Sequence, residues 1–200
     1  MEKINLRKAK ILGEIGIILS FLDTAVSLSF RRFRWAPQNL PYNYGGHGSL
    51  VLNVSLFLPS IVSTVLLLLA FYEISKRTQE REIFSNYLTS LLIGLIGAVV
   101  IAVAAIVFAN SLKNMSGIVI ATIGIFAIAV VIASTYFLSK SLKRTGEVLE
   151  NDYFVKAGTF MLYGAYLLVI LVGAILSLIA AIYVAIGFFT MREELEINGE

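Results

Sequence analysis

Several stretches of this chain run for more than twenty residues without a charged side chain, and the clearest lie at 88–109 and 117–138. A helix needs about 20 apolar residues, at about 1.5 Å of rise each, to cross the hydrocarbon core of a bilayer. Charged residues make up 14% of the chain, against about 25% in ordinary soluble domains. The sequence therefore predicts an all-α integral membrane protein, built as a single membrane domain over residues 1–200.

We predict five transmembrane helices packed as a compact bundle. An outer loop is expected at 31–49, and an acidic tail at 191–200. A cleaved signal peptide is the alternative for the first span, although its two acids, Glu14 and Asp23, suit a signal peptide poorly. The fifth span is longer than a bilayer requires, so we expect it to tilt or to project past the membrane. The predicted spans are 11–30, 50–72, 88–109, 117–138 and 158–190.

A basic segment occurs twice in the chain. The residues 76–80 (KRTQE) recur as 143–147 (KRTGE), a shift of 67 positions (143 − 76). In each copy paired aromatic residues close the preceding apolar run, and a further apolar run follows. The pattern predicts a helix–basic loop–helix unit used twice in parallel, so that the second and third spans match the fourth and fifth.

The distribution of lysine and arginine predicts the orientation. With five spans, the N-terminus and the two basic segments share one side, which carries eleven basic residues against five on the other side. Basic residues are enriched in cytoplasmic loops. We therefore predict a multi-pass protein of the cell membrane with a cytoplasmic N-terminus and an extracytoplasmic C-terminus.

Small residues recur along one face of the first span. Gly13, Gly16, Ser20, Asp23 and Ser27 follow one another at steps of three and four, which places them on one stripe of a helix. Lipid gives helices no hydrophobic drive to associate, so small residues that allow close backbone approach mark contact faces. The stripe predicts that Asp23 faces neighbouring helices.

Asp23 is the first candidate site residue. A carboxylate inside a span costs roughly 2.5–3.5 kcal/mol on insertion scales and is a functional hypothesis by default. Asn53 lies at a similar depth in the second span, and Asn110 and Thr122 lie near the outer ends of the third and fourth. This polar cluster could bind an ion, a proton or a small polar substrate. Alternatively, Asp23 is structural, either neutral or paired with Asn53 or with an arginine from 31–34.

Two further residues suggest helix interruptions. Pro59 and Gly124 each lie 12 residues before the first aromatic residue that closes their span. Matched interruptions in two repeats point to the binding site of a transporter. A plain kink at each position is the alternative.

The repeated basic segment supplies a third set of candidates. Lys76, Arg77, Lys143 and Arg144 are positioned to contact anionic lipid headgroups on the cytoplasmic side. Alternatively, these cations only complement the helix dipole at C-terminal ends and set the topology.

Several short motifs resemble a known family. They are 9–16 (AKILGEIG), 73–76 (EISK) followed by 83–88 (IFSNYL), and 187–189 (GFF). Together they resemble a mainly archaeal family of integral membrane proteins of unknown function. The resemblance implies a multi-pass membrane protein and supplies no activity, cofactor or site.

The residue inventory bounds the function. The chain has no cysteine and one histidine, and the sequence shows no paired catalytic residues, so we expect no enzyme, no cofactor and no metal site. We do not expect nucleic acid as a partner, because the basic residues lie beside apolar runs and not on a soluble face. We favour a non-enzymatic structural or accessory subunit of a membrane assembly, which contacts lipids and forms a homo-oligomer or a larger complex. The alternative is a small secondary transporter or channel with a polar site near Asp23.

Overall fold

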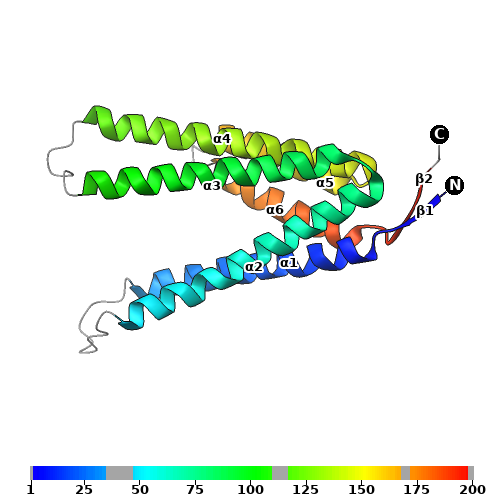
Figure 1. Ribbon diagram of the computed structural model, residues 1–200, viewed down its shortest axis with the longest axis horizontal. Helices are drawn as coiled ribbons and strands as arrows, with labels where there is room; N and C mark the ends of the chain where they lie inside the picture. Colours follow the sequence, from blue (N-terminus) through cyan, green and yellow to red (C-terminus); the bar gives the residue numbers. More distant parts are fainter. Residues whose placement is uncertain (1, 35–46, 110–116, 168–171, 198–200) are drawn as a thin grey trace.

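The computed structural model describes residues 2–34, 47–109, 117–167 and 172–197 (Figure 1). Helices dominate this part of the chain, so the all-α prediction is confirmed apart from two four-residue strands. The elements in chain order are β1 (Glu2–Asn5), α1 (Arg7–Arg34), α2 (His47–Thr78), α3 (Arg81–Ala109), α4 (Gly117–Val148), α5 (Asp152–Tyr166), α6 (Val172–Thr190) and β2 (Glu194–Ile197).

The helices pack mainly as neighbours in the chain. α1 lies against α2, α3 against α4, and α5 against both α4 and α6. Both strands and the α2–α3 and α4–α5 turns gather at one end of the molecule, on the right in Figure 1, which we call the charged end. Toward the opposite end the α1–α2 pair and the α3–α4 pair diverge. We call the parts of these two pairs that lie away from the charged end the arms; the predicted compact bundle exists near the charged end but not along the arms.

Four helical segments of the described chain are long and apolar enough to cross a membrane. They are Leu58–Thr78, Arg81–Ala104, Ala121–Val148 and Val172–Thr190. α1, which corresponds to the first predicted span, is not among them, and its described part carries Lys10, Glu14 and Asp23. The four segments fit a multi-pass membrane protein, whereas the count of five spans is not confirmed.

The predicted fifth span, 158–190, is wrong because it joins the second part of α5 to α6, and these two helices run antiparallel. A Cβ atom at Gly164, near the end of α5, would lie 2.8 Å from Ser177 Oγ near the start of α6. At the other end of the pair, Asn151 Nδ2 before α5 donates to the carbonyl oxygen of Gly187 at 3.1 Å. Residues 167–172 are all apolar, so neither a polar residue nor a proline marks the reversal in the sequence.

The additional reversal brings the two ends of the chain together. β1 pairs antiparallel with β2, with Glu2 opposite Ile197 and Asn5 opposite Glu194. The amide of Leu6 also donates to the carbonyl oxygen of Glu193 at 2.7 Å. The prediction that the termini lie on opposite sides of a membrane is therefore wrong, and part of the predicted acidic tail, 191–200, is a paired strand.

An aromatic core lies next to the charged end. Phe71, Phe154 and Phe188 are fully buried. The ring of Phe71 stacks on Tyr87 at 4.4 Å between centroids, and Phe188 meets Phe71 and Phe154 edge-on at 5.9 and 5.1 Å. A Cβ atom at Gly13 would lie 2.1 Å from the Phe188 ring. The small-residue stripe of α1 is thus a contact face, since only glycine leaves room for this ring.

The two turns of the predicted repeat share local features. Each contains a non-glycine residue with positive φ, Gln79 at 59° and Glu150 at 51°. Each also follows a buried threonine, Thr78 or Thr145, whose hydroxyl donates to the carbonyl oxygen four residues earlier at 2.8 Å. However, α3 has 29 residues and α5 has 15. The likeness therefore covers the turns, and a repeat of whole helical hairpins is not confirmed.

Candidate functional site

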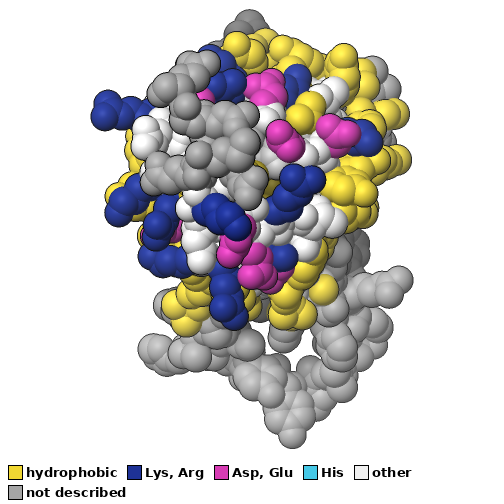
Figure 2. Space-filling model, turned by 90° about the vertical axis from the view of Figure 1, so that its right-hand side faces the viewer, with side chains coloured by type: hydrophobic (Ala, Val, Ile, Leu, Met, Phe, Trp, Pro, Cys, Tyr) yellow, Lys and Arg dark blue, Asp and Glu magenta, His cyan; other side chains and the backbone are white. Residues whose placement is uncertain are grey.

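Charged side chains gather on the charged end, where Figure 2 shows lysine, arginine and acidic residues on one face with hydrophobic side chains around them. The ion pairs found in the described part of the chain all lie here. They join Lys8 to Glu73, Arg77 to Glu73, Lys10 to Glu193, Arg144 to Glu80 and Glu147, and Arg192 to Glu150.

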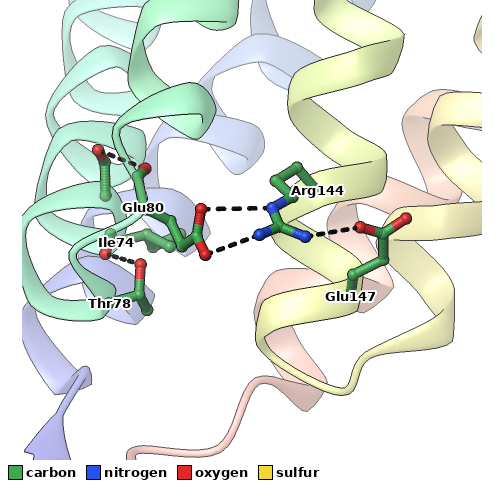
Figure 3. A network of polar contacts seen from close by, with 6 residues as sticks. Ile74, Thr78, Glu80, Arg144 and Glu147 are labelled. Atoms are coloured by element: carbon green, nitrogen blue, oxygen red, sulfur yellow. Dashed lines mark hydrogen bonds and ion pairs between the residues drawn. The ribbon is translucent and has the colours of Figure 1, made fainter. Parts of the chain in front are cut away.

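Arg144 links the two turns (Figure 3). Its Nη2 lies 2.7 Å from Glu80 Oε1 and its Nε lies 3.3 Å from Glu80 Oε2, a two-pronged pairing across 64 positions of sequence. Its Nη1 lies 3.3 Å from Glu147 Oε2 on the same helix. The backbone of Glu80 is held in turn, because Ser75 Oγ donates to its carbonyl oxygen at 2.8 Å. Arg144 therefore fixes α4 to the turn between α2 and α3.

Glu73 makes the corresponding link between α1 and α2. Its side chain is 11% exposed and accepts from Lys8 Nζ on α1. Arg77, one helical turn further along α2, lies 3.7 Å from the second carboxylate oxygen. A carboxylate this deeply buried needs such cationic partners, because an unpaired buried charge is strongly destabilising.

Buried hydroxyls and an amide tie the remaining helices together. Ser141 Oγ on α4 donates to the carbonyl oxygen of Ile83 at 2.7 Å, and Ser139 Oγ donates to that of Gly158 on α5 at 2.6 Å. Asn151 caps α5 by accepting from the amide of Tyr153 at 3.1 Å. Among the described residues, no buried side-chain nitrogen or oxygen lacks a hydrogen-bond partner. The polar groups of the charged end thus act as cross-links between helices.

The four predicted lipid-contact cations differ in their surroundings. Arg77 and Arg144 are held in the ion pairs above, whereas Lys76 is exposed and Lys143 is half-buried. Sequence reasoning missed their acidic partners. The spacing of Glu73 and Arg77, four residues apart, could have revealed one pair, but no local signal points from Glu80 to Arg144.

Asp23 lies at the interface of α1 and α2. It is half-buried, and its carboxylate accepts a hydrogen bond from Ser60 Oγ. On the same interface Ser63 Oγ donates to the carbonyl oxygen of Gly16 at 2.9 Å. Asp23 therefore faces α2, as the stripe predicted, but its partner Ser60 was not among the residues named from the sequence.

The other members of the predicted polar cluster do not join this pair. Asn110 and the side chain of Asn53 lie outside the described residues. Thr122 is exposed on α4, and α4 lies in the arm that diverges from α1 and α2 (Figure 1). The divergence of the arms therefore keeps Thr122 apart from Asp23.

The two predicted interruptions lie inside continuous helices. α2 runs through Pro59 and α4 runs through Gly124 without ending. A Cβ atom at Gly124 would meet no other atom within 4 Å. A transport role for these positions stays a prediction. Within the described ranges, no cluster of three or more histidine or acidic side chains is placed to hold a metal.

Comparisons with known proteins connect the chain to relatives without an assigned activity. Residues 59–182 match a family model described as "Protein of unknown function (DUF996)". A protein of Methanocaldococcus jannaschii named "Uncharacterized protein MJ1644" is 26% identical over 205 residues, which cover 98% of this chain and 98% of that protein. No solved structure matches.

Proposed function

This chain belongs to the DUF996 family of proteins of unknown function, and from that premise we propose that it is a structural or accessory subunit of a membrane assembly. The resemblance indicated by the short sequence motifs is thereby confirmed. The family carries no assigned chemistry, so the proposal rests on the surfaces and contacts of the chain itself.

The observation that carries the proposal is the exposed apolar surface of the arms. The most apolar stretch of α4 contains no buried residue. On α3, Leu95 is 63% exposed and Ile106 is 73% exposed. Apolar surface on this scale is stable only against lipid or against other apolar helices. The arms therefore offer long faces to a second copy of the chain or to partner helices.

The state of the polar groups supports a role without catalysis. Glu73 and Glu80 at the charged end are engaged in ion pairs between helices, and the buried hydroxyls of Ser139 and Ser141 are bonded to backbone carbonyls. A catalytic acid or base needs to reach a substrate within hydrogen-bonding distance. Groups already committed to cross-links are better suited to fixing helices than to chemistry.

Purification in a mild detergent tests the accessory role. After chemical cross-linking in the membrane, we expect either a stoichiometric partner protein or a defined multiple of the chain mass of 21.9 kDa. A uniform monomer with no stoichiometric companion, before and after cross-linking, would rule the role out. Two variants make a matched comparison. Leu95→Trp on an arm should reduce the cross-linked product, whereas Tyr72→Trp near the charged end should not, since only the first alters the face assigned to a partner.

The orientation that we propose differs from the one predicted from five spans. With both termini at the charged end, twelve of the sixteen basic residues in the sequence belong to that end. The positive-inside rule then places the charged end in the cytoplasm. The twelve are Lys3, Arg7, Lys8, Lys10, Lys76, Arg77, Arg81, Lys140, Lys143, Arg144, Lys156 and Arg192.

Reporter fusions after Glu200 test this orientation. A fluorescent protein that folds only in the cytoplasm is expected to be bright, and a phosphatase that is active only outside the cytoplasm is expected to be silent. The same pair of reporters fused before Met1 should give the same result. An active phosphatase at either end would contradict the proposal.

A transporter or channel is the second candidate, because Asp23 is only half-buried and Ser60, its partner, directly follows Pro59; the hydrogen bond between them fits the structural role. For the accessory role, Asp23→Asn should change the free energy of unfolding by less than about 0.5 kcal/mol, because an amide keeps the hydrogen bond. Asp23→Leu should cost about 1–3 kcal/mol, since it leaves the Ser60 hydroxyl without its acceptor. For transport, Asp23→Asn would instead abolish proton- or cation-coupled flux in liposomes while the protein stays folded.

A further inference from the structure

A shallow groove of about 380 Å³ lies at the start of α1. It is lined by Asn5, Arg7, Lys8, Ile11 and Leu12. Its surface is almost wholly apolar, so the charged groups of Arg7 and Lys8 contribute little to it, and we call the edge formed by these two residues the rim. It belongs to the charged end, because β1 and the first turn of α1 are part of that end (Figure 1). A groove that combines an apolar floor with a basic rim is suited to an amphiphilic anion.

Arg7 supplies the positive charge at the rim. Its backbone amide donates to Asn5 Oδ1 at 2.9 Å, which fixes the start of the helix. Its exposed guanidinium takes part in none of the ion pairs of the described residues. The neighbouring Lys8 is paired with Glu73, yet 68% of its side chain is exposed. The first turn of α1 carries no acidic residue that would neutralise Arg7.

An apolar stripe continues from the groove along α1. Ile11 lies in the groove itself, and Ile15, Ile18 and Leu22 follow at steps of four, three and four. All four side chains are exposed and, at this spacing, lie on one face of the helix. The stripe gives a hydrocarbon chain a continuous surface that leads away from the charged rim.

We propose that this groove binds one anionic phospholipid, with its phosphate at Arg7 and an acyl chain along Ile11, Ile15 and Ile18. Charge complementarity selects an anion, and the apolar floor selects one that carries a hydrocarbon chain. Of the four cations first considered for lipid contacts, Arg77 and Arg144 are less suited, because they are already held by acids. The inference rests on the chain spanning a membrane, and not on its role in an assembly.

Lipid titration of the purified full chain tests the site. Native mass spectrometry in a non-ionic detergent would compare phosphatidylglycerol with phosphatidylcholine. The unchanged protein should prefer phosphatidylglycerol, and Arg7→Gln should weaken that binding about fivefold, the equivalent of about 1 kcal/mol for one cation at a membrane surface. Binding of phosphatidylcholine should stay the same. Arg81→Gln is the matched control, since Arg81 is also an exposed arginine that begins a helix but lies outside the groove.

Two further measurements distinguish a phospholipid site from a simple phosphate site and from diffuse surface charge. Ile11→Ser should weaken the binding of both lipids, because it removes part of the apolar floor, and inorganic phosphate should not displace phosphatidylglycerol. An equal loss in Arg7→Gln and Arg81→Gln would overturn the proposal in favour of diffuse surface charge. Displacement by phosphate, or no preference for the anionic lipid, would also overturn it. Neither result bears on the cross-linked mass, so the accessory role stands or fails by its own test.

Discussion

The helices pack by different interactions at the charged end and along the arms. At the charged end, large aromatic side chains are fully buried and ion pairs join elements distant in sequence. Along the arms, the helices touch in pairs and leave most large hydrophobic side chains exposed. The difference indicates that the interactions that hold the fold of the single chain are concentrated at the charged end, while the arms depend on what surrounds them.

Close contact within an arm comes from small residues. A Cβ atom at Gly97 on α3 would lie 2.2 Å from Val130 Cγ1 on α4, and Ser134 Oγ donates to the carbonyl oxygen of Ser90 at 3.0 Å. In lipid no hydrophobic drive brings helices together, so van der Waals contact and hydrogen bonds between close backbones take its place. The α3–α4 arm is therefore held along a narrow seam, and its remaining surface is free for lipid or for partner helices.

Removing a core ring should give the largest contrast between the two regions. Phe188 is fully buried against Phe71, Phe154 and Gly13, so Phe188→Ala should lower the free energy of unfolding by about 3–5 kcal/mol. Leu95→Ala on the exposed face of α3 should cost less than about 0.5 kcal/mol in detergent, as exposed substitutions usually do. Circular dichroism during titration with a denaturing detergent would measure both.

Equal losses of unfolding free energy in Phe188→Ala and Leu95→Ala would contradict the difference between the charged end and the arms. They would mean that the arms contribute to the fold of the isolated chain as strongly as the aromatic core does. A large loss for Leu95→Ala only in the membrane, and not in detergent, would instead locate its partner outside the chain.

The sequence predicts the arms better than it predicts the charged end. The predicted spans 50–72, 88–109 and 117–138 lie inside α2, α3 and α4, because a long charge-free run directly reflects contact with lipid. The reversal between α5 and α6 could not be predicted, since 167–172 is as apolar as the helices around it. The β1–β2 pairing joins four-residue segments at opposite ends of the chain, which leave no periodic pattern to detect.

Prediction of the candidate site from the sequence is limited in the same way: patterns within one helix are readable, and contacts between helices are not. The direction of Asp23 followed from helical spacing along one element, and the structure agrees with it. The partner of Asp23 depends on how α1 and α2 are aligned, which no single-helix pattern specifies. The pairing of Arg144 with Glu80 spans 64 positions, and Glu80 directly follows Gln79, whose positive φ is a conformation that a glutamine in the sequence does not indicate.

Replacing a glycine with alanine should give a difference in stability between the two regions that is smaller than the one from removing a core ring. Gly13→Ala would place a Cβ atom 2.1 Å from the Phe188 ring, so the ring must move, at a cost of about 1–3 kcal/mol for overpacking a core. At Gly124 a Cβ atom meets nothing within 4 Å. Gly124→Ala should therefore be neutral or stabilise its helix by up to about 1 kcal/mol, the usual gain of alanine over glycine.

The same unfolding assay measures both glycine variants. A destabilising Gly13→Ala together with a neutral or stabilising Gly124→Ala would locate the tight contact at the charged end and the open surface on the arm. A destabilising Gly124→Ala in membranes, with no effect in detergent, would show that another helix approaches α4 at this point.

The smallest expected effect is the contribution of ion pairs to stability at the charged end, beyond the contribution of its aromatic core. Arg144 and Glu80 are 39% and 32% exposed and paired by two prongs, whereas Arg192 and Glu150 are 70% and 74% exposed and lie 3.6 Å apart. A double-mutant cycle with Arg144→Gln and Glu80→Gln should give a coupling free energy of about 0.5–1 kcal/mol at low salt, the upper part of the range for partly exposed pairs. The cycle with Arg192→Gln and Glu150→Gln should give no measurable coupling free energy.

Salt should reduce the coupling between Arg144 and Glu80, because it screens partly exposed charges over roughly 10 Å at 0.1 M. Identical couplings in the two cycles would mean that the Arg144 network adds nothing specific, and that the aromatic core alone distinguishes the charged end from the arms.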